Sequence, residues 1–575
     1  MDYNRLDTDN TAAEVYDSAL YDSYLSPLEA FYQREQKQAD EIAFVQPYPT
    51  GRVEEITWAQ AGEQVRSMAA YLSTLKLAPG SRVAILSNNC AHWIMADLAI
   101  WMAGFVGVPL YPVLTAASIQ PILEHSECQA IFIGKLADWP AMEAGVPETL
   151  HRISLAICPP EVKNAKPWQD VMTEMPALTQ SPVMPMEALA TIIYTSGTTG
   201  MPKGVMHSFR NLAAVGELTG RMYESGSQDR MLSYLPLAHC AERAAVQTNQ
   251  LYRGFRVYFA NSLETFGEDL QRARPTLFFA VPRIWLKLQQ RVLEKIPAKK
   301  LDLLLRLPLI SRFIRKKLTG ALGMDQLNIA ISGAAPLSTH LIDWYGRLGI
   351  TILEGYAMSE NFAYSHASKQ GEGRIGYVGS TNPHVVCKIA DSGEILVKSP
   401  TNMTGYYKEP ELSAEAIDPD GFLHTGDKGE IDSEGRLKIT GRIKDIFKTS
   451  KGKYVAPAPI EDKFMKSVAI EQVCVAGSDL PQPLALVTLT ESAQNSRLVE
   501  LSKEELNQEM ASLLTEVNAT LDKHERMTAL VILTDTWSVE NNMMTPTLKI
   551  KRAEVESAYQ ASFDQWSVAG GVVWA

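Results

Sequence analysis

The sequence predicts an α/β protein. It has a large N-terminal body of several subdomains, in which helices flank mostly parallel sheets, and a small α+β C-terminal domain. From about residue 80 to 400, short apolar runs alternate with helical segments, as in the expected strand at 81–87 and helix at 91–104. This order is typical of parallel sheets covered by helices. Beyond about residue 390 the expected strands are short and lie between Asp-Gly or Glu-Gly turns, which is typical of antiparallel pairs.

The chain is 575 residues long, and we predict two domains, 1–440 and 441–575. The last 135 residues are enough for a small domain with its own core. Further strands of the first domain are expected at 105–111, 130–133, 191–194, 231–234, 256–259, 276–279, 327–331 and 350–353, with helical patterns at 115–125 and 206–219. Towards the C-terminus we expect strands at 393–398, 435–440, 471–477, 484–490 and 528–533, and helices at 459–467 and 503–523.

Composition excludes several classes of protein. The chain is 46% hydrophobic and 21% charged, which is ordinary for a globular protein and argues against disorder, collagen or coiled coil. It carries 54 Lys and Arg against 66 Asp and Glu, a formal charge of −12. A protein this acidic has no overall attraction for nucleic acid, so we predict no nucleic-acid partner.

The cysteine spacing predicts a reducing compartment, and the lack of a long apolar run predicts a soluble protein. The six cysteines form no Cys-x-x-Cys pair, so neither a disulfide scaffold nor a zinc site is expected. The N-terminus is polar, and no apolar run approaches the roughly 20 residues that span a bilayer. We therefore expect a soluble cytoplasmic protein.

The strongest local motif is the run YTSGTTGMPKG at 194–204. Glycines let the backbone approach a ligand closely, hydroxyls donate hydrogen bonds and a lysine supplies charge, a combination that suits a polyphosphate. It is not a Walker A loop, because Lys203 is followed by Gly204 and not by Ser or Thr. The alternative is a flexible polar turn. The candidate phosphate-binding residues are Thr195, Ser196, Gly197, Thr198, Thr199, Gly200 and Lys203.

Two further motifs follow expected strands. In SGAAP at 332–336, small residues would let a flat ring approach the backbone, although a tight strand–helix turn would look the same. In EGYAMSE at 354–360, Tyr356 can stack on a purine, Ser359 can donate to a phosphate, and Glu360 offers a hard oxygen to Mg²⁺. A lone glutamate in a loop is more often simply solvated.

Three more motifs lie towards the C-terminus. Asp427, in GFLHTGD at 421–427, can accept hydrogen bonds from two ribose hydroxyls, and Arg442 follows in GRIKD at 441–445. An ordinary turn aspartate and a surface arginine are the alternatives. Near the end of the chain, Lys549 lies in MTPTLKIKR at 544–552 and can neutralise charge on a phosphate. Its alternative is a basic tail on a solvated face.

These motifs together resemble the adenylate-forming superfamily, which includes acyl-CoA synthetases, firefly luciferase and peptide-synthetase adenylation domains. They occur in the family's order across residues 194–552. The resemblance implies that a mobile C-terminal domain turns about Lys444 and that the segment 448–457, through Gly452, forms the pantetheine tunnel. It implies catalytic roles for Thr195, Glu360 and Lys549, with Glu360 also the Mg²⁺ ligand. It further implies a nucleotide site that contains Gly333, Ala334, Ala335, Glu354, Gly355, Tyr356, Ser359, Asp427 and Arg442.

Three other runs resemble the long-chain fatty acyl-CoA synthetases: YLPLAHCAER at 234–243, PTLFFAVPRIW at 275–285 and GVPLY at 107–111. In that branch His239 matches a position beside the acyl pocket, although a core histidine is an equal alternative. The resemblance implies that fatty acid, ATP and coenzyme A give acyl-CoA, AMP and pyrophosphate, with Mg²⁺ as cofactor. The alternatives are an acyl-AMP ligase that serves a carrier protein or other nucleophile, a ligase for another carboxylic acid, and a silent nucleotide or acyl sensor.

One stretch is left unexplained by these motifs. Residues 286–322 interleave Lys and Arg with Leu, Ile and Phe, most densely at 299–318 (KKLDLLLRLPLISRFIRKKL). A basic, apolar stretch of this kind can lie on an anionic bilayer, which would give peripheral membrane contact. The alternative is an ordinary helical hairpin broken at Pro308.

Overall fold

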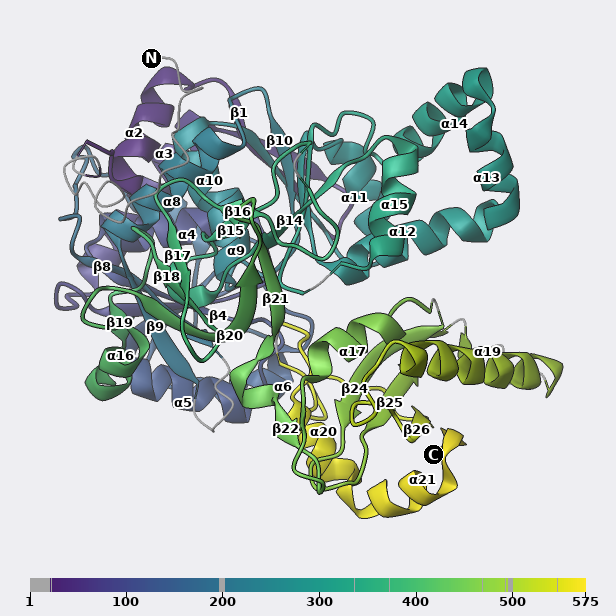
Figure 1. The fold of residues 1–575 in the computed structure, drawn as a ribbon. Coiled ribbons are helices and arrows are strands. Elements are labelled where there is room, and N and C mark those ends of the chain that lie inside the picture. The colour runs from purple at the N-terminus through teal and green to yellow at the C-terminus, as the bar shows by residue number, and fades with distance from the viewer. Residues whose placement is uncertain are drawn as a thin grey trace. The chain divides into compact units, whose positions relative to one another are not determined.

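A computed structural model describes the fold (Figure 1). The described residues form two compact units. Unit 1 holds the chain through Leu337 together with Leu341–Lys388 and Leu396–His424, and unit 2 holds Ser338–His340, Ile389–Ile395 and Thr425–Ala575. Because each unit contains several separate segments of the chain, the predicted single boundary at 440/441 stays a prediction. The structure describes residues 21, 23–195, 202–335, 337–371, 373–467, 469–491, 493–494, 500–545 and 547–575.

An eight-stranded sheet is the centre of unit 1, in the order β19-β9-β8-β4-β3-β5-β6-β7. The strands from β8 to β7 run parallel, whereas β9 and β19 are antiparallel to their neighbours. The parallel strands β3, β4 and β5 are almost wholly buried, which explains why they appear in the sequence as continuous apolar runs. The bounds are β3 Arg82–Leu86, β4 Val106–Leu110, β5 Cys128–Ile133, β6 His151–Ser154, β7 Lys166–Pro167, β8 Leu189–Thr195, β9 Lys203–Ser208 and β19 Gly405–Tyr406.

Helices cover this sheet. α4 (Ala91–Met102) is buried along its whole length and contacts both β3 and β4. α5 (Ala116–Ser126) packs against a different set of strand residues through Ile119 and Ile122, which contact the cluster that contains Val108 and Ile131. The neighbouring helices are α2 Pro27–Lys37, α3 Trp58–Thr74, α6 Trp139–Glu143, α7 Trp168–Glu174 and α8 Phe209–Met222.

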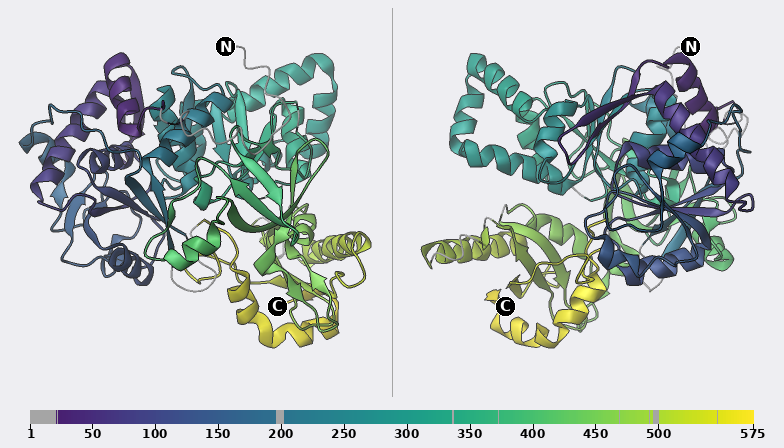
Figure 2. Two further views of the ribbon diagram at one scale, coloured as in Figure 1. Left: turned by 60° about the vertical axis from the view of Figure 1, so that its left-hand side comes forward. Right: turned by 180° about the vertical axis from the view of Figure 1, so that it is seen from behind.

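Two smaller sheets also belong to unit 1, and Figure 2 shows the whole ribbon from two further sides. In the first, of order β10-β11-β1-β2, only β2 is antiparallel; in the second, of order β12-β13-β14-β15-β16, the first three strands are parallel. The prediction of mostly parallel sheets flanked by helices is confirmed. Their bounds are β1 Ile42–Pro47, β2 Val53–Thr57, β10 Arg230–Ser233, β11 Arg256–Phe259, β12 Leu277–Ala280, β13 Ile329–Ser332, β14 Ile352–Tyr356, β15 His366–Ala367 and β16 Ser380–Thr381.

The helical pattern predicted at 206–219 is wrong at its start. Residues up to Ser208 belong to β9, which pairs antiparallel with β8, and the helix α8 begins only at Phe209. Ser208 is the reason for this boundary, because its side chain accepts a hydrogen bond from the Asn211 backbone and Asn211 bonds back to the Ser208 amide. Such a capping box fixes the first turn of a helix.

A buried ion pair ties the sheet to its helices. Asp97 of α4 accepts from the Arg243 guanidinium at 2.5 Å and from the Gln247 side-chain amide at 2.7 Å. Arg243 also donates to the Thr191 hydroxyl of β8 at 2.7 Å. Arg243 and Gln247 lie in a π-helical turn, η1 (Arg243–Thr248), between α9 (Cys240–Glu242) and α10 (Asn249–Arg253). A side chain at Gly107 would lie 2.5 Å from the Asp97 carboxylate, so this glycine makes room for the pair.

The stretch 286–322 folds into helices of unit 1. α12 (Pro282–Lys295), α13 (Ala298–Arg306) and α14 (Pro308–Ala321) follow one another, and α13 packs against α14. Pro308 is the first residue of α14, where a missing amide proton costs nothing. The helical hairpin broken at Pro308 is therefore confirmed, and α11 (Phe266–Ala273) and α15 (Thr339–Leu348) contribute residues to the same core cluster.

Unit 2 is a small α+β structure, as predicted. A sheet of order β24-β25-β26-β27 contributes to two clusters of buried residues. Residues of α17 and α19 complete one cluster, and residues of α20 and α21 complete the other. A four-stranded sheet of order β17-β18-β20-β21, in which β20 and β21 are antiparallel, and a short hairpin of β22 with β23 precede it in the chain. Three strands have residues in both units: β17 Val386–Ile389, β18 Glu394–Lys398 and β20 Leu423–Ile431. The bounds of the others are β21 Leu437–Arg442, β22 Phe447–Lys448, β23 Tyr454–Val455, α17 Pro457–Phe464, β24 Ile470–Ala476, β25 Leu484–Leu489, α19 Glu500–Ala519, β26 Ala529–Leu533, α20 Arg552–Tyr559, α21 Phe563–Ala569 and β27 Gly571–Trp574.

The buried pair predicts a large loss of stability when one partner is removed. Arg243→Met should lower the free energy of unfolding by about 3–5 kcal/mol, because Asp97 would be left as an uncompensated buried charge. Arg52→Ala, which breaks the exposed pair with Glu54, should cost less than about 1 kcal/mol. Urea unfolding followed by tryptophan fluorescence measures both. Equal losses in the two variants would contradict a structural role for the buried pair.

Candidate active site

The predicted phosphate-binding segment connects two strands. β8 ends at Thr195, β9 begins at Lys203, and these two residues are register partners in the antiparallel pair. The structure therefore places Thr195 and Lys203 side by side at the end of the strand pair where the chain passes from β8 to β9. The five other predicted phosphate-binding residues, Ser196, Gly197, Thr198, Thr199 and Gly200, lie outside the described residues.

A tyrosine connects Lys203 with Glu360. The Lys203 ammonium lies 5.2 Å from the centre of the Tyr406 ring, within the range of a cation–π contact. The Tyr406 hydroxyl donates to Glu360 Oε1 at 2.9 Å. Burial and the neighbouring carboxylate raise the pKa of Tyr406, so its hydroxyl keeps the proton that it donates. A cation, a phenol and a carboxylate thus lie next to one another where phosphate is expected to bind.

Tyr406 was missed by sequence reasoning. It belongs to the two-residue strand β19, which pairs with β9 about 200 residues away in the chain and sets Tyr406 opposite Val205. The only local signal is the pair of tyrosines after Gly405, which also fits a buried strand end. The backbone next to the carboxylate is fixed as well, because the Met403 amide donates to the Glu360 carbonyl at 2.7 Å.

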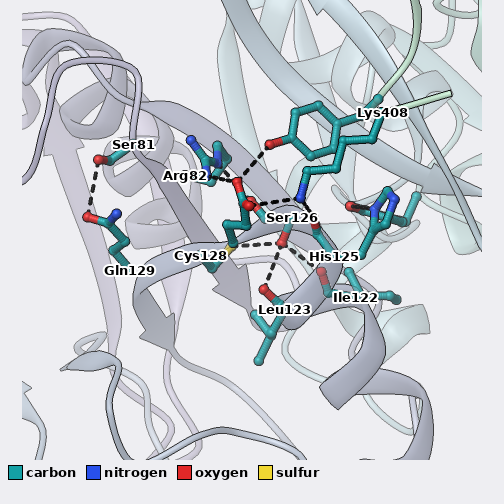
Figure 3. A network of polar contacts seen from close by, with 12 residues as sticks. Ser81, Arg82, Ile122, Leu123, His125, Ser126, Cys128, Gln129 and Lys408 are labelled. Carbon is teal, nitrogen blue, oxygen red and sulfur yellow. Dashed lines mark hydrogen bonds and ion pairs between the residues drawn. The ribbon is translucent and has the colours of Figure 1, made fainter. Parts of the chain in front are cut away.

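A polar network fixes the residues that follow β19 (Figure 3). Lys408 donates to the His125 carbonyl at 2.9 Å and forms an ion pair with Glu127 at 3.0 Å. Glu127 also pairs with Arg82 of β3, and the Tyr407 amide donates to the Gly204 carbonyl of β9 at 2.8 Å. The segment 405–408 is therefore attached both to the C-terminal end of α5 and to the strand that carries Lys203.

The predicted adenine-binding turns lie next to each other. Gly333, Ala334 and Ala335 follow β13, and the parallel neighbour β14 pairs with it through Ser332 and Glu354. A side chain at Gly333 would lie 3.3 Å from the Gly355 carbonyl and 3.3 Å from the Phe279 ring. A side chain at Gly333 would make tight contacts here, so the glycine favours the close approach of the two turns. In open α/β sheets, ligands bind at the carboxyl ends of parallel strands, which is where these turns lie.

Tyr356 is less available for stacking than its motif suggests. The residue is 9% exposed, and its ring lies 6.0 Å from that of His366. Stacking on a purine stays a prediction.

Ser359 and Glu360 belong to a short 3₁₀ turn, η2 (Ser359–Asn361), that a buried histidine fixes in place. His207 Nε2 lies 2.8 Å from the Ser359 carbonyl. Burial lowers the pKa of His207 to about 3, so the ring is neutral and donates through Nε2. The Cys240 thiol donates to the Ser359 hydroxyl at 3.5 Å. The turn that presents Glu360 is thus attached to β9 and to the 234–243 motif.

His239, predicted beside the acyl pocket, caps a helix. Its Nδ1 accepts from the Ala241 amide at 3.0 Å at the start of α9, and the residue is partly exposed. This contact accounts for one ring nitrogen, and the role beside an acyl chain stays a prediction.

Glu242 of the same motif is a buried acid that the motif did not identify. Its Oε1 accepts from the Ser233 hydroxyl at 2.8 Å, the Tyr234 amide at 3.0 Å and the Asn89 side chain at 3.3 Å. Burial raises the pKa of Glu242 to about 8 in spite of these donors. The contacts join β10 to the residues before α4, so Glu242 acts in packing.

In unit 2 the two predicted ribose-binding residues meet. The Arg442 guanidinium donates to Asp427 Oδ1 at 2.8 Å, and the two residues are register partners in β20 and β21. The Thr425 hydroxyl donates to the Ile395 carbonyl at 2.7 Å, and the Gly426 amide donates to Glu394 at 2.9 Å. An aspartate held in this way beside an arginine suits a diol, although binding of ribose stays a prediction.

Lys444 and Gly452 lie on exposed backbone. Lys444 is in the 3₁₀ turn η3 (Ile443–Asp445) directly after β21. Gly452 has a φ of +76° in the turn of the β22–β23 hairpin, and its amide donates to the Thr449 carbonyl at 2.8 Å. There is space for a side chain at this position, but residues other than glycine rarely adopt such a positive φ. The hinge and the pantetheine tunnel stay predictions.

The basic residues around Lys549 have different roles. Arg552 is partly buried, and it pairs with Glu461 at 2.7 Å and donates to the Val475 carbonyl. Lys551 donates to Asn542 at 2.6 Å. Lys549 is exposed on a turn closed by the Thr545 amide, which donates to the Lys549 carbonyl at 2.8 Å. An exposed lysine suits contact with a ligand, whereas Arg552 serves the fold.

Comparisons with known proteins identify the family. The model described as "AMP-binding enzyme" matches residues 31–407, and that described as "AMP-binding enzyme C-terminal domain" matches residues 444–566. The chain therefore belongs to the AMP-binding enzymes.

Two relatives are similar to the chain over nearly its whole length. It is 29% identical to the human "Long-chain-fatty-acid–CoA ligase 1" over 585 residues, covering 90% of this chain and 82% of the relative. It is 30% identical to "Long-chain-fatty-acid–CoA ligase FadD15" of Mycobacterium bovis over 555 residues, covering 89% of this chain and 92% of the relative. The predicted membership of the adenylate-forming superfamily, with resemblance to long-chain acyl-CoA synthetases, is confirmed.

Solved structures share the fold. The anthranilate CoA ligase AuaEII with anthranoyl-AMP has a TM-score of 0.76 at 20% identity, and the alignment covers 94% of this chain and 98% of that one. The o-succinylbenzoate CoA synthetase of Bacillus subtilis with AMP has a TM-score of 0.72 at 21% identity, with 93% and 98% covered.

Glu242 makes stability depend on pH. The folded chain holds the Glu242 proton up to about pH 8, whereas the unfolded chain loses it near 4.5. The free energy of unfolding should therefore fall as the pH rises through this interval. Glu242→Gln stays neutral and should lose that part of the dependence. Urea midpoints of both proteins at pH 5.5 and 8.0 measure the effect, and parallel pH profiles would refute it.

Tyr406 should position the Glu360 carboxylate. Tyr406→Phe keeps the ring beside Lys203 but removes the hydrogen bond to Glu360. Pyrophosphate release that depends on the fatty acid substrate should therefore fall about tenfold, as expected for loss of a hydrogen bond to a charged group. Tyr407→Phe is the matched control, since its hydroxyl donates to the exposed Glu127 at 3.3 Å and not to Glu360. Pyrophosphate release at saturating ATP is the measurement. A loss in the control as large as that in Tyr406→Phe would exclude the specific role.

Proposed function

We propose that the chain is a long-chain fatty acid–CoA ligase, which joins fatty acid, ATP and coenzyme A into acyl-CoA with release of AMP and pyrophosphate. The observation that carries the proposal is the group of Lys203, Tyr406 and Glu360 beside the strand ends of unit 1. It occurs in a chain whose relatives over nearly its whole length are named long-chain-fatty-acid–CoA ligases.

In the first half-reaction a fatty carboxylate oxygen attacks the α-phosphorus of ATP. The bond from this phosphorus to the bridging oxygen breaks, and pyrophosphate leaves with the electron pair. Lys203 and the hydroxyl of Thr195 would meet the phosphates at the end of the β8–β9 pair. Lys549 would neutralise charge that develops on the α-phosphate. Fixed cations at such a point lower the barrier without reorganisation.

The residues at Glu360 fit a magnesium ion. Mg²⁺ is usually held by one or two carboxylates, by substrate phosphates and by water. Glu360 supplies one carboxylate, of which Oε1 is oriented by Tyr406. Within the described part of the chain no cluster of three or more acidic, histidine or cysteine side chains offers an all-protein site. When bound, the ion would offset phosphate charge, and Glu360 is the residue that would hold it.

In the second half-reaction the sulfur of coenzyme A attacks the acyl carbonyl. The thioester bond forms, the bond to the AMP oxygen breaks, and the thiol proton passes to solvent or phosphate. The exposed hairpin turn at Gly452 is the segment that we assign to the pantetheine arm. Asp427 and Arg442 would hold the ribose of the adenylate through both steps.

A panel of carboxylic acids tests this function. Pyrophosphate release should be greatest with long-chain fatty acids, and thioester should form only when coenzyme A is present. No turnover with any fatty acid would reject the proposal. Adenylate that accumulates even in the presence of coenzyme A would favour transfer to a carrier protein or another nucleophile.

Lys549→Ala should separate the two half-reactions. Adenylate formation should fall by at least about a hundredfold, as for loss of a group that stabilises transition-state charge. Thioester formation from supplied acyl-adenylate should stay within a few-fold of the wild type. Lys551→Ala, which removes a neighbouring lysine bonded to Asn542, is the control and should leave both steps nearly unchanged. Equal losses in both half-reactions would disprove the assignment.

A further inference from the structure

The helices α13 and α14 carry charge opposite to that of the whole protein. Residues 282–321 contain eleven lysines and arginines but only two acids, Glu294 and Asp302, in a chain of net charge −12. One of these acids is already neutralised, because Asp302 pairs with Arg347 of α15 at 2.5 Å. The region is therefore a strongly basic patch on an acidic protein.

Each of the two helices has a buried and an exposed face. Leu301 of α13 and Leu318 of α14 are buried in the core cluster that also contains Trp285 and Trp344, and Leu305 and Ile314 pack against it. These contacts account for the inner face. The stability of the hairpin therefore does not require apolar residues on the outer face.

The outer face nevertheless carries large apolar side chains. Leu303 is 62% exposed and Phe313 is 67% exposed, with Leu307 and Ile310 also exposed between them. Ile310 and Phe313 are three residues apart in α14, so they share one side of that helix. Leu303 lies in α13, and Leu307 lies in the connection between the two helices. Large apolar residues that gather on a surface mark an interaction site more often than single ones do.

Basic residues flank these apolar residues along α13 and α14. Seven lysines and arginines of the two helices are exposed: Lys299, Lys300, Arg306, Arg312, Arg315, Lys316 and Lys317. In Figures 1 and 2 the ends of α13 and α14 project away from the sheets of unit 1. We call this surface, Leu303, Leu307, Ile310 and Phe313 with the seven basic residues, the outer hairpin face.

We propose that the outer hairpin face docks on an anionic lipid bilayer. Its apolar side chains would enter the boundary between headgroups and acyl chains, while lysines and arginines stay among the anionic headgroups. No helix among the described residues is both long and apolar enough to cross a bilayer, so this contact would be peripheral. Phe313 and Leu303 act as anchors, and each basic residue adds attraction that salt weakens.

The composition of this face favours a bilayer over other polyanions. A nucleic acid would match the charge but gives aliphatic side chains such as Leu303 and Ile310 no apolar layer to enter. The proposal does not rest on the proposed ligase activity, because docking requires no turnover. If the chain does activate fatty acids, the surface would bring it to the phase in which long-chain acids dissolve.

Two independent variants test the docking in the full-length protein. Sedimentation with vesicles of phosphatidylcholine alone, or with one third phosphatidylglycerol, at 0.15 M salt gives the partition constant. Leu303→Ser/Phe313→Ser should weaken binding to anionic vesicles at least about tenfold, through loss of buried apolar area. Lys316→Glu/Lys317→Glu should weaken it at least about 25-fold, since each basic residue near the surface adds roughly fivefold.

Matched controls separate this face from general surface effects. Leu263→Ser changes another exposed leucine, 75% exposed, on unit 1, and Lys369→Glu/Lys523→Glu makes the same charge change elsewhere. Both should bind like the wild type. All variants should keep the wild-type circular dichroism and melting temperature, because every changed side chain is exposed.

Three results would overturn the proposal. The first is no binding to anionic vesicles at 0.15 M salt. The second is binding that Leu303→Ser/Phe313→Ser leaves unchanged, which would place the contact elsewhere or make it purely electrostatic. The third is stronger binding to DNA than to vesicles, weakened by the lysine variant alone, which would assign the patch to a nucleic acid.

Discussion

The pairing of β19 with β9 is the constraint on which the candidate site depends. It brings Tyr406 beside Lys203, and the Tyr406 hydroxyl then reaches Glu360. Without this pairing a lysine at a strand end and a glutamate in a distant turn would be two separate surface charges. With it, they are held at fixed distances from one phenol ring. A site of this kind is organised before substrate arrives, and such preorganisation is what lowers a barrier in phosphoryl chemistry.

Buried polar contacts keep the supporting elements in place. His207 fixes the turn that presents Glu360, Arg243 joins Asp97 to β8, and Glu242 links β10 to the residues that precede α4. All three residues are buried and would be costly if unpaired. Two of them, Glu242 and Arg243, lie in the motif that resembles long-chain synthetases. Their burial means that the motif reports packing around the site as much as contact with substrate.

Much of the fold could be predicted because buried parallel strands are continuous apolar runs. β3, β10 and β26 lie within a residue or two of their predicted bounds for this reason. The helix predicted at 206–219 overlaps the last three residues of β9, because the six residues of this strand show no clear alternation and its pairing depends on β8. Tyr406 could not be found, because its role arises from contacts with residues far away in the chain. Only the three-dimensional structure separates Arg552, which is partly buried and pairs with Glu461, from the exposed Lys549.

The central claim is that Tyr406 and Glu360 act as one unit on the phosphates. A double-mutant cycle with Tyr406→Phe and Glu360→Gln, followed by fatty-acid-dependent exchange of pyrophosphate into ATP, measures their coupling directly. If Tyr406 acts by orienting the Glu360 carboxylate, the double variant should be no slower than Glu360→Gln alone. If the two losses multiply, the residues act independently and the account of the site is wrong.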